Sequence, residues 1–275
     1  MPQCPICPRR CNLKEGQLGF CRARACINDK IVPINYGHFT SLALDPIEKK
    51  PLYHFYAGSR ILSIGSFGCN LRCPFCQNYE ISMAGINDVA HQSITPWELC
   101  DLAIKLAHEP AGNLGVAFTY NEPFIGYEFV RDCCVVLHQA GLKTVLVSNG
   151  HINREPLEDL LPLIDAMNID LKGYTQSYYD YVGGYLDCVK QTIATAYEKC
   201  HVEVTTLIVP TKNDSVEEME AEAEWLASLS PEIPLHISRY FPRYKCNIAA
   251  TPLETIFQLR DTAQKYLKYV HVGNC

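Results

Sequence analysis

Short runs rich in β-branched residues alternate with amphipathic stretches along most of this 275-residue chain. Each run ends close to the start of a segment with helical periodicity, which is typical of repeated βα units around a parallel sheet. Six such units predict an α/β fold, either a partial TIM-type (β/α)6 barrel or a nearly complete one. The expected strands cover residues 61–65, 115–120, 144–148, 166–171, 202–209 and 235–239, with a short one at 269–272.

The clearest expected helix begins at Thr95-Pro96-Trp97-Glu98, which combines a capping-box pattern with proline at the first helical position. The other expected helices cover about 123–140, 155–163, 186–199, 215–230 and 252–267. We expect two parts, a Cys-rich N-terminal segment over residues 1–58 and the barrel over residues 59–275.

The composition favours a cytoplasmic enzyme of one main domain. With 24 basic and 30 acidic residues the net charge is −6, which argues against general nucleic-acid binding through phosphate neutralisation. No apolar run approaches the ~18 residues of a membrane span, so no membrane association is expected. The first residues lack the basic and apolar regions of a secretory signal. Fifteen cysteines, an odd number in a large chain, fit reduced thiols and metal ligands better than disulfides.

Three cysteines directly follow the first expected strand. Cys69, Cys73 and Cys76 form the pattern Cys-x-x-x-Cys-x-Phe-Cys. Iron–sulfur clusters are normally held by four cysteines, so three would leave one iron of a [4Fe–4S] cluster open to an outside ligand. The alternatives are a zinc loop or three buried thiols, but zinc sites usually take four ligands, or three plus water, from dispersed positions.

This spacing, with Phe75 before the third cysteine, resembles the signature of the radical SAM superfamily. The resemblance implies that the amino and carboxylate groups of S-adenosylmethionine (SAM) chelate the open iron. An electron from the reduced cluster would then break the sulfonium bond to C5′, giving a 5′-deoxyadenosyl radical that abstracts hydrogen. It also implies an electron donor such as ferredoxin or flavodoxin.

Polar residues end each expected strand, and barrel enzymes place their sites at these carboxyl ends. Asp170 and Lys172 are two apart on one strand and therefore share a face. His236 would share a face of the sixth strand with Ser238 and Tyr240. The alternative for the charged residues is a salt bridge that closes the barrel mouth, and for His236 it is a structural hydrogen bond.

The resemblance assigns SAM-binding roles at this edge. Glu122 occupies the place of the acid in the family's Gly-Gly-Glu segment, which binds the methionine amino group, although Tyr120 and Asn121 stand where the family has glycines. Asp170 and Lys172 resemble the Asp-x-Lys of pyruvate formate-lyase activating enzymes, which helps to hold the amino and carboxylate groups.

Two further segments complete this assignment. Ser148 and Asn149 resemble that group's Thr-Asn-Gly segment near the ribose, and Phe75 would lie near the adenine. The expected cofactor-binding residues are thus Phe75, Asn121, Glu122, Ser148, Asn149, Asp170, Lys172 and His236. No catalytic residue is assigned.

A closer resemblance covers nearly the whole chain. Segments 45–52, 76–82, 119–123 and 238–242 resemble the radical SAM enzyme of the AmmeMemoRadiSam system, a group related to glycyl-radical-enzyme activases. This implies abstraction of a glycyl Cα hydrogen from a partner protein. The alternatives are radical modification of a small molecule, a peptide or a nucleotide. A non-catalytic iron–sulfur or zinc protein is disfavoured, because no fourth cysteine follows Cys76 before Cys100.

A second cysteine set, Cys4, Cys7, Cys11 and Cys21, lies near the amino terminus. The prolines and glycines between them favour a knuckle of turns, which a metal would need to stabilise because so short a segment buries little apolar surface. Zinc and a second iron–sulfur cluster both accept thiolates at these spacings, and the sequence does not choose between them.

An aromatic segment follows the fourth expected strand, with five tyrosines between residues 174 and 185. It would either cover the substrate or pack against the barrel mouth.

Overall fold

The computed structural model describes residues 1–275, and its core is one eight-stranded sheet. The strand order is β12-β11-β10-β9-β8-β7-β5-β4, and neighbours pair parallel throughout except for β4 against β5. The edge strands β12 and β4 do not pair with each other, so the barrel is partial. The strands are β4 (Ser41–Pro46), β5 (Arg60–Gly65), β7 (Gly115–Phe118), β8 (Lys143–Ser148), β9 (Ala166–Asp170), β10 (His201–Ile208), β11 (Leu235–Arg239) and β12 (Val270–Gly273).

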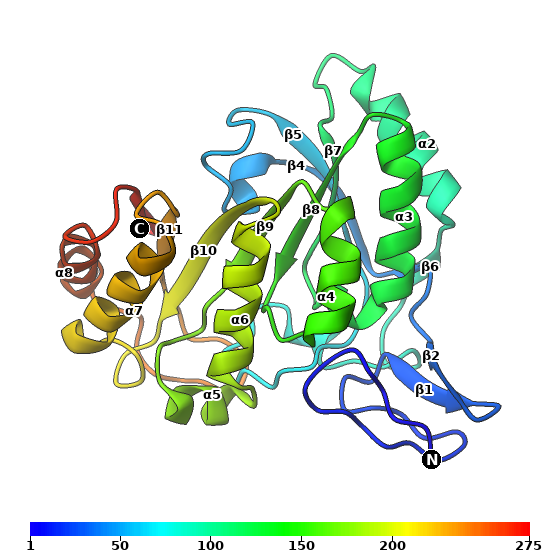
Figure 1. Cartoon of the computed structure of the whole chain (residues 1–275), viewed down its shortest axis with the longest axis horizontal. Helices are drawn as coiled ribbons and strands as arrows, with labels where there is room; N and C mark the ends of the chain where they lie inside the picture. Colours follow the sequence, from blue (N-terminus) through cyan, green and yellow to red (C-terminus); the bar gives the residue numbers. More distant parts are fainter.

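Helices cover the outer face of the curved sheet, as Figure 1 shows. The central strands are buried on both faces, and all four residues of β7 are buried, as expected for parallel strands covered by helices. The α/β barrel expected from the sequence is therefore confirmed. The helices are α1 (Tyr79–Ser82), α2 (Pro96–Ala107), α3 (Tyr127–Gln139), α4 (Arg154–Leu160), α5 (Gln176–Val182), α6 (Leu186–Tyr197), α7 (Val216–Leu229) and α8 (Leu253–Ala263).

Local sequence signals explain several helix boundaries. The Thr95 side chain accepts from Glu98 N, and Glu98 accepts from Thr95 N, so α2 begins with the expected capping box. Two of the expected helices, at about 123–140 and 155–163, are each split into an α-helix and a 3-10 turn. The 3-10 turn η2 (Pro123–Gly126) precedes α3, and η3 (Leu161–Leu163) follows α4. Pro162 has no N–H to continue the α-helical ladder.

The chain before β4 forms a knuckle beside the barrel. It contains the hairpin β1 (Arg24–Ile27) and β2 (Lys30–Pro33), joined by Asn28 and Asp29 with φ of 52° and 55°. Positive φ at both central residues is the geometry of a tight hairpin turn. The short strands β3 (His38–Phe39) and β6 (Gln92–Ser93) pair with each other. Although β4 precedes the expected boundary at residue 58, it pairs with β5 along its whole length.

The segment after β4 closes the floor of the barrel. It begins with the 3-10 turn η1 (Ile47–Lys49). Glu203 on β10 accepts from Tyr53 N at 3.0 Å and from His54 N at 2.8 Å, and Asn168 on β9 donates to the Pro51 carbonyl at 2.8 Å. Glu203 and Asn168 precede the carboxyl ends of their strands, so this segment lies across the amino-terminal part of the barrel.

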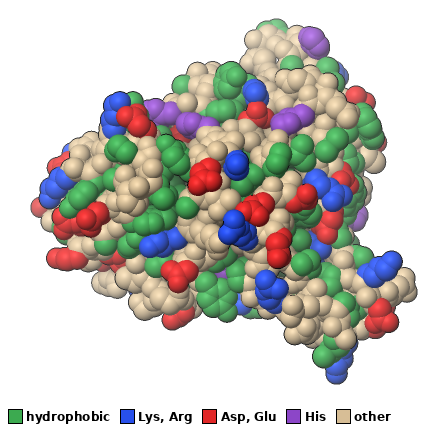
Figure 2. Space-filling model, in the orientation of Figure 1, with side chains coloured by type: hydrophobic (Ala, Val, Ile, Leu, Met, Phe, Trp, Pro, Cys, Tyr) green, Lys and Arg blue, Asp and Glu red, His purple; other side chains and the backbone are tan.

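Acidic and basic side chains are interspersed over the face drawn in Figure 2, with no extended area of one sign. No helix of this chain combines the length and the apolar character that crossing a membrane requires.

Candidate active site

Three free cysteines in the loop between β5 and α1 line one cavity. Cys69, Cys73 and Cys76 border a cavity of about 390 Å³ at the carboxyl ends of the strands. Burial raises the pKa of the Cys73 thiol to about 12 and also raises the pKa of Cys69 and of Cys76. These thiols need a nearby cation to become thiolates at neutral pH.

The spacing of the three sulfur atoms suits a cluster better than a single ion. They do not all lie within 4.8 Å of one another. Thiolates on one tetrahedral zinc stand about 3.8 Å apart, since each Zn–S bond is about 2.3 Å long. Three separated thiols around a cavity therefore fit a [4Fe–4S] cluster with one iron open.

Asn121 fixes the entrance of the cysteine loop. Its side-chain oxygen accepts from Ser66 N at 2.9 Å, and its amide nitrogen donates to the carbonyls of Phe67 and Gly68 at 3.2 and 3.1 Å. These bonds replace a regular strand ladder where β5 ends. Asn121 also lines the cavity, so it both shapes the loop and borders the site.

Tyr120 takes the left-handed backbone conformation, which glycine adopts more readily than any other residue. Its φ is 70°, which costs about 1–3 kcal/mol for a residue with a side chain. Two contacts hold it there. The Tyr120 hydroxyl donates to Asp45 at 2.8 Å, and Asn78 donates to the Tyr120 carbonyl at 2.7 Å. The glycine-like geometry is thus kept without glycine.

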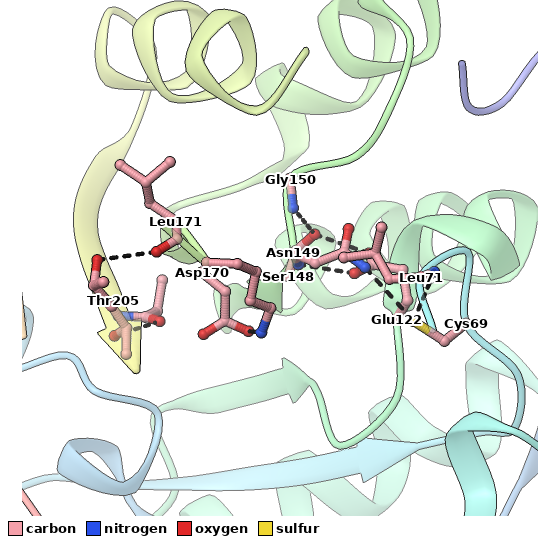
Figure 3. A network of polar contacts seen from close by, with 12 residues as sticks. Cys69, Leu71, Glu122, Ser148, Asn149, Gly150, Asp170, Leu171 and Thr205 are labelled. Atoms are coloured by element: carbon pink, nitrogen blue, oxygen red, sulfur yellow. Dashed lines mark hydrogen bonds and ion pairs between the residues drawn. The ribbon is translucent and has the colours of Figure 1, made fainter. Parts of the chain in front are cut away.

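Glu122 is a buried carboxylate at the centre of a hydrogen-bond network (Figure 3). It accepts from Phe124 N at 2.9 Å, from the Ser148 hydroxyl at 2.8 Å and from Asn149 N at 2.8 Å. Burial raises the pKa of Glu122 to about 7, although these hydrogen bonds oppose the rise. A carboxylate has about four lone-pair sites, so one remains for a ligand.

The Asn149 side chain links this network to the cysteine loop. Its amide nitrogen donates to the Asn70 side chain at 2.9 Å and lies 3.6 Å from the sulfur of Cys69. Ser148 donates to Glu122 and accepts from Gly150 N at 3.0 Å, so its hydroxyl is used within the network. Asn149 lines the cavity together with Glu122.

Asp170 and Lys172 form an ion pair of 2.7 Å on the cavity wall, drawn in Figure 3. Burial disfavours the charged form of Lys172 and so lowers its pKa. The opposing electrostatic effects of Asp170, Cys73 and Cys76 are larger together, and the pKa of Lys172 therefore lies above its usual value. The pair offers one anion and one cation side by side, which matches the carboxylate and ammonium of a bound amino acid.

Phe75 is buried and lines the cavity within an aromatic cluster. Its ring centroid lies 6.3 Å from that of Tyr178 and 6.4 Å from those of Tyr181 and Tyr240. Tyr178 and Tyr179, both in α5, are fully or nearly fully buried. Tyr178 and Tyr181 of the aromatic segment after β9 thus pack against the cysteine loop.

His236 lies outside the cavity. It faces the barrel floor, where its ring nitrogen Nε2 is 2.6 Å from a carboxylate oxygen of Glu203. His201 contacts the other Glu203 oxygen at 2.9 Å. His236 precedes Ser238 on the same face of β11, and Ser238 is the residue of this pair that reaches the cavity.

Several cavity residues were not expected from the sequence. Asn78 follows the third cysteine closely, so proximity to the motif could have indicated it. Thr205 shares a strand face with Leu207 in β10, which an alternation argument could have found. Asn274 lies near the end of the chain and carries no sequence signal for this role.

The profile of the Radical SAM superfamily matches residues 63–226, which include the cysteine loop, Glu122, Asp170 and Lys172. The chain belongs to the radical SAM superfamily. It is therefore an enzyme of radical chemistry, and enzymes of this superfamily use a [4Fe–4S] cluster and SAM. The residues of the cavity are consistent with both cofactors, since they supply three thiols beside a paired anion and cation.

Two relatives come from Methanocaldococcus jannaschii. An uncharacterised protein is 41% identical over 276 residues, which cover 99% of this chain and 81% of that protein. The 7-carboxy-7-deazaguanine synthase is 22% identical over 225 residues, covering 78% of this chain and 88% of the synthase.

Among solved structures, a domain of a pyruvate-formate lyase-activating enzyme from Bacteroides vulgatus superimposes with a TM-score of 0.52 and 18% identity, covering 58% of this chain and 99% of the domain. Streptococcus suis SuiB bound to S-adenosylmethionine gives a TM-score of 0.61 and 13% identity, covering 78% of this chain and 52% of SuiB. At these identities the likeness shows a shared fold.

Proposed function

We propose that this radical SAM enzyme holds a site-differentiated [4Fe–4S] cluster at Cys69, Cys73 and Cys76 and cleaves SAM reductively. When bound and reduced, the cluster supplies the electron that splits the sulfonium and yields the 5′-deoxyadenosyl radical. The observation that carries the proposal is that all three thiols, Glu122 and the Asp170–Lys172 pair border one cavity.

Charge complementarity supports a binding role for the Asp170–Lys172 pair. In the free protein the two side chains neutralise each other at 2.7 Å. In the complex with SAM, Asp170 would bind the methionyl ammonium group and Lys172 would bind the methionyl carboxylate. A hydrogen bond to a charged group contributes ~1.5–3 kcal/mol, which is enough for tenfold or greater effects on affinity.

The network around Glu122 supports a second contact to the methionyl ammonium. A positive charge beside this carboxylate would favour its ionised form, which burial alone disfavours. Asn149 and Asn121 line the cavity and would orient the ribose end, and Phe75 would contact the adenine. Ser148 does not line the cavity, and it would act through its hydrogen bond to Glu122.

The barrel supports containment of a reactive radical. The floor segment lies across the amino-terminal end of the sheet, where Glu203 and Asn168 hold it by hydrogen bonds, and this would limit solvent entry from that end. Exclusion of water prevents side reactions of reactive intermediates.

For the substrate, we propose a glycyl residue of a partner protein, whose Cα hydrogen the radical abstracts. Under this proposal the chain would belong with the AmmeMemoRadiSam enzymes and the related glycyl-radical-enzyme activases. The fold shared with the activating-enzyme domain of Bacteroides vulgatus supports this proposal. The enzyme would act in the cytoplasm with a ferredoxin or flavodoxin as donor.

The alternative is a small molecule, a free peptide or a nucleotide as substrate. SuiB has been solved bound to its precursor peptide SuiA, and one relative is a 7-carboxy-7-deazaguanine synthase. Under this alternative the enzyme would use the same cofactors, but the radical would take its hydrogen from the small molecule, peptide or nucleotide and not from a glycyl residue.

An isotope experiment separates the two classes of substrate. Cells of the source organism are grown on [2,2-²H]glycine, and their extract is divided into a protein fraction and a small-molecule fraction. Each fraction is incubated without oxygen with reduced enzyme and SAM, and 5′-deoxyadenosine is examined by mass spectrometry. Deuterium transferred from the protein fraction supports the glycyl proposal, whereas stimulation by the small-molecule fraction alone contradicts it.

A further inference from the structure

The N-terminal knuckle gathers four thiols around a cavity of its own. Cys4, Cys7, Cys11 and Cys21 all line it, and all four are free. Three of them are buried, with exposed fractions of 6–8%, and Cys11 is half-buried. The remaining lining consists of Ile6, Arg9, Gly19, Phe20, Arg24 and Ile125.

Backbone turns hold these cysteines in place. Cys4 N donates to the Cys11 carbonyl at 2.9 Å, and Arg10 N donates to the Cys7 carbonyl at 3.0 Å. Gly19 N donates to the Arg24 carbonyl at 2.8 Å, which turns the chain beside Cys21. These hydrogen bonds fix the backbone of the turns that carry the four thiols.

The sulfur spacing argues against zinc. No three of the four sulfur atoms all lie within 4.8 Å of one another, whereas thiolates on one zinc stand about 3.8 Å apart. A compact single-ion geometry does occur elsewhere in this segment, at Glu15, Cys26 and Asp29. The sulfur atoms of Cys69, Cys73 and Cys76, the cysteines at the radical SAM motif, likewise do not all lie within 4.8 Å of one another.

A buried guanidinium provides a second, independent observation. Arg24 is 3% exposed and lines the cavity. Its terminal nitrogens donate to both carboxylate oxygens of Glu128 at 2.7 and 2.6 Å, but its Nε has no partner. A buried N–H without a partner is costly, and a thiolate or sulfide acceptor in the cavity would remove that cost. A cluster with four thiolates is anionic and would also attract the cation.

The knuckle is joined directly to the radical SAM loop. Cys69 N donates to the Cys21 carbonyl at 3.2 Å. Two arginines strengthen the junction, since Arg9 donates to the Asn70 carbonyl at 2.8 Å and Arg72 donates to the Phe20 carbonyl. Cys21 of the N-terminal set and Cys69 of the radical SAM set are therefore linked by a single backbone hydrogen bond.

From the separated thiols, the unpartnered Arg24 Nε and this junction, we infer that Cys4, Cys7, Cys11 and Cys21 hold a second iron–sulfur cluster that passes electrons to the cluster at Cys69, Cys73 and Cys76. One electron enters from a ferredoxin or flavodoxin, reduces the second cluster and moves on to the first, and no bond breaks in this step. The transfer rests on the proposed function, but the presence of the second cluster does not.

The first test removes the radical SAM site. The full-length triple variant Cys69→Ala/Cys73→Ala/Cys76→Ala is reconstituted with iron and sulfide in the presence of zinc, and its metals are counted. The inference predicts at least two irons with inorganic sulfide per chain and an S = ½ EPR signal on reduction. One zinc per chain with no iron overturns it, whatever the outcome of the SAM assays.

The second test keeps the radical SAM site and removes the other. The variant Cys7→Ala/Cys21→Ala is compared with Cys26→Ala, a buried cysteine of the same segment whose sulfur faces Glu15. The double variant should contain less iron than the control. It should still hold the four irons of the cluster at Cys69, Cys73 and Cys76. Its 5′-deoxyadenosine formation should fall at least tenfold with reduced flavodoxin but much less with dithionite, a small reductant. Unchanged iron in the double variant overturns the inference.

Discussion

The backbone N–H of Cys69 donates to the carbonyl of Cys21 at 3.2 Å, which joins the two cysteine sets. The residue before Cys69 makes this approach possible. Gly68 has φ of 85°, and a Cβ there would collide with the Cys21 carbonyl and crowd Ala23 and Ile125. Glycine at this position therefore allows the knuckle and the radical SAM loop to come into contact.

Gly68→Ala should weaken this contact. We expect a loss of about 2–4 kcal/mol of unfolding free energy, from the strained backbone and from the collision, together with lower iron content. Gly112→Ala is the matched control, because Gly112 has φ of 66° with no atom within 4 Å of the added Cβ. Denaturant unfolding and iron analysis measure both effects. Equal losses in the two variants would show that backbone strain alone matters at residue 68.

Lys172→Met should weaken SAM binding without emptying the cluster. We expect the Kd for SAM to rise on the order of 10-fold or more, because a charged hydrogen bond is lost. Lys143→Met is the control, since Lys143 pairs with Asp165 at the same 2.7 Å distance but outside the cavity. Anaerobic equilibrium dialysis with labelled SAM gives the affinities, and iron analysis gives the loading. An unchanged Kd in Lys172→Met would remove this residue from the site.

His236 was assigned to the cofactor from the sequence, and its contact with Glu203 below the cavity gives a different expectation. We expect His236→Asn to lower the melting temperature while the Kd for SAM stays within about twofold of wild type, since the lost hydrogen bond is structural. Differential scanning calorimetry and dialysis measure the two quantities. A tenfold rise in Kd at unchanged stability would restore the cofactor role.

Glu222 provides a pH-dependent test of stability away from the cavity. It is 1% exposed, and burial raises its pKa to about 8, with only Thr206 as hydrogen-bond partner. The folded protein retains this proton between about pH 4.5 and 8 while the unfolded chain releases it, so the free energy of unfolding falls as pH rises through that window.

Glu222→Gln removes this titration. The variant should gain stability relative to wild type as pH rises, by up to about 5 kcal/mol at pH 8, and should be close to wild type near pH 4.5. Urea unfolding across this range measures the difference. A constant difference at all pH values would contradict the raised pKa of Glu222.

The strands and most helices of the barrel could be predicted from the sequence, because buried parallel strands leave uninterrupted β-branched runs. β11 has the expected bounds, Leu235–Arg239. β7 ends at Phe118, earlier than expected, because Tyr120 takes a left-handed conformation. β4 was missed since an edge strand with a half-exposed face carries a weak pattern.

The candidate site could be predicted in part from the sequence. Motif spacing and strand ends indicated the thiols, Glu122 and the Asp170–Lys172 pair, which the structure brings to one cavity. Alternation along β11 could not decide which inward residue reaches the cavity, so His236 was assigned to the cofactor and Ser238, which lines the cavity, was not. Distances between the N-terminal sulfur atoms depend on turns and on the docking of the knuckle, which no local pattern encodes.

The most direct test of the central proposal is anaerobic formation of 5′-deoxyadenosine from SAM by the reconstituted, reduced enzyme, measured beside Cys73→Ala and the control Cys200→Ala. Cys200 lies outside the cavity, and its thiol donates to the Ala196 carbonyl. The proposal predicts 5′-deoxyadenosine and methionine from wild type and Cys200→Ala, and none above background from Cys73→Ala. Equal product from Cys73→Ala, or none from a fully loaded wild type supplied with both extract fractions, would contradict it.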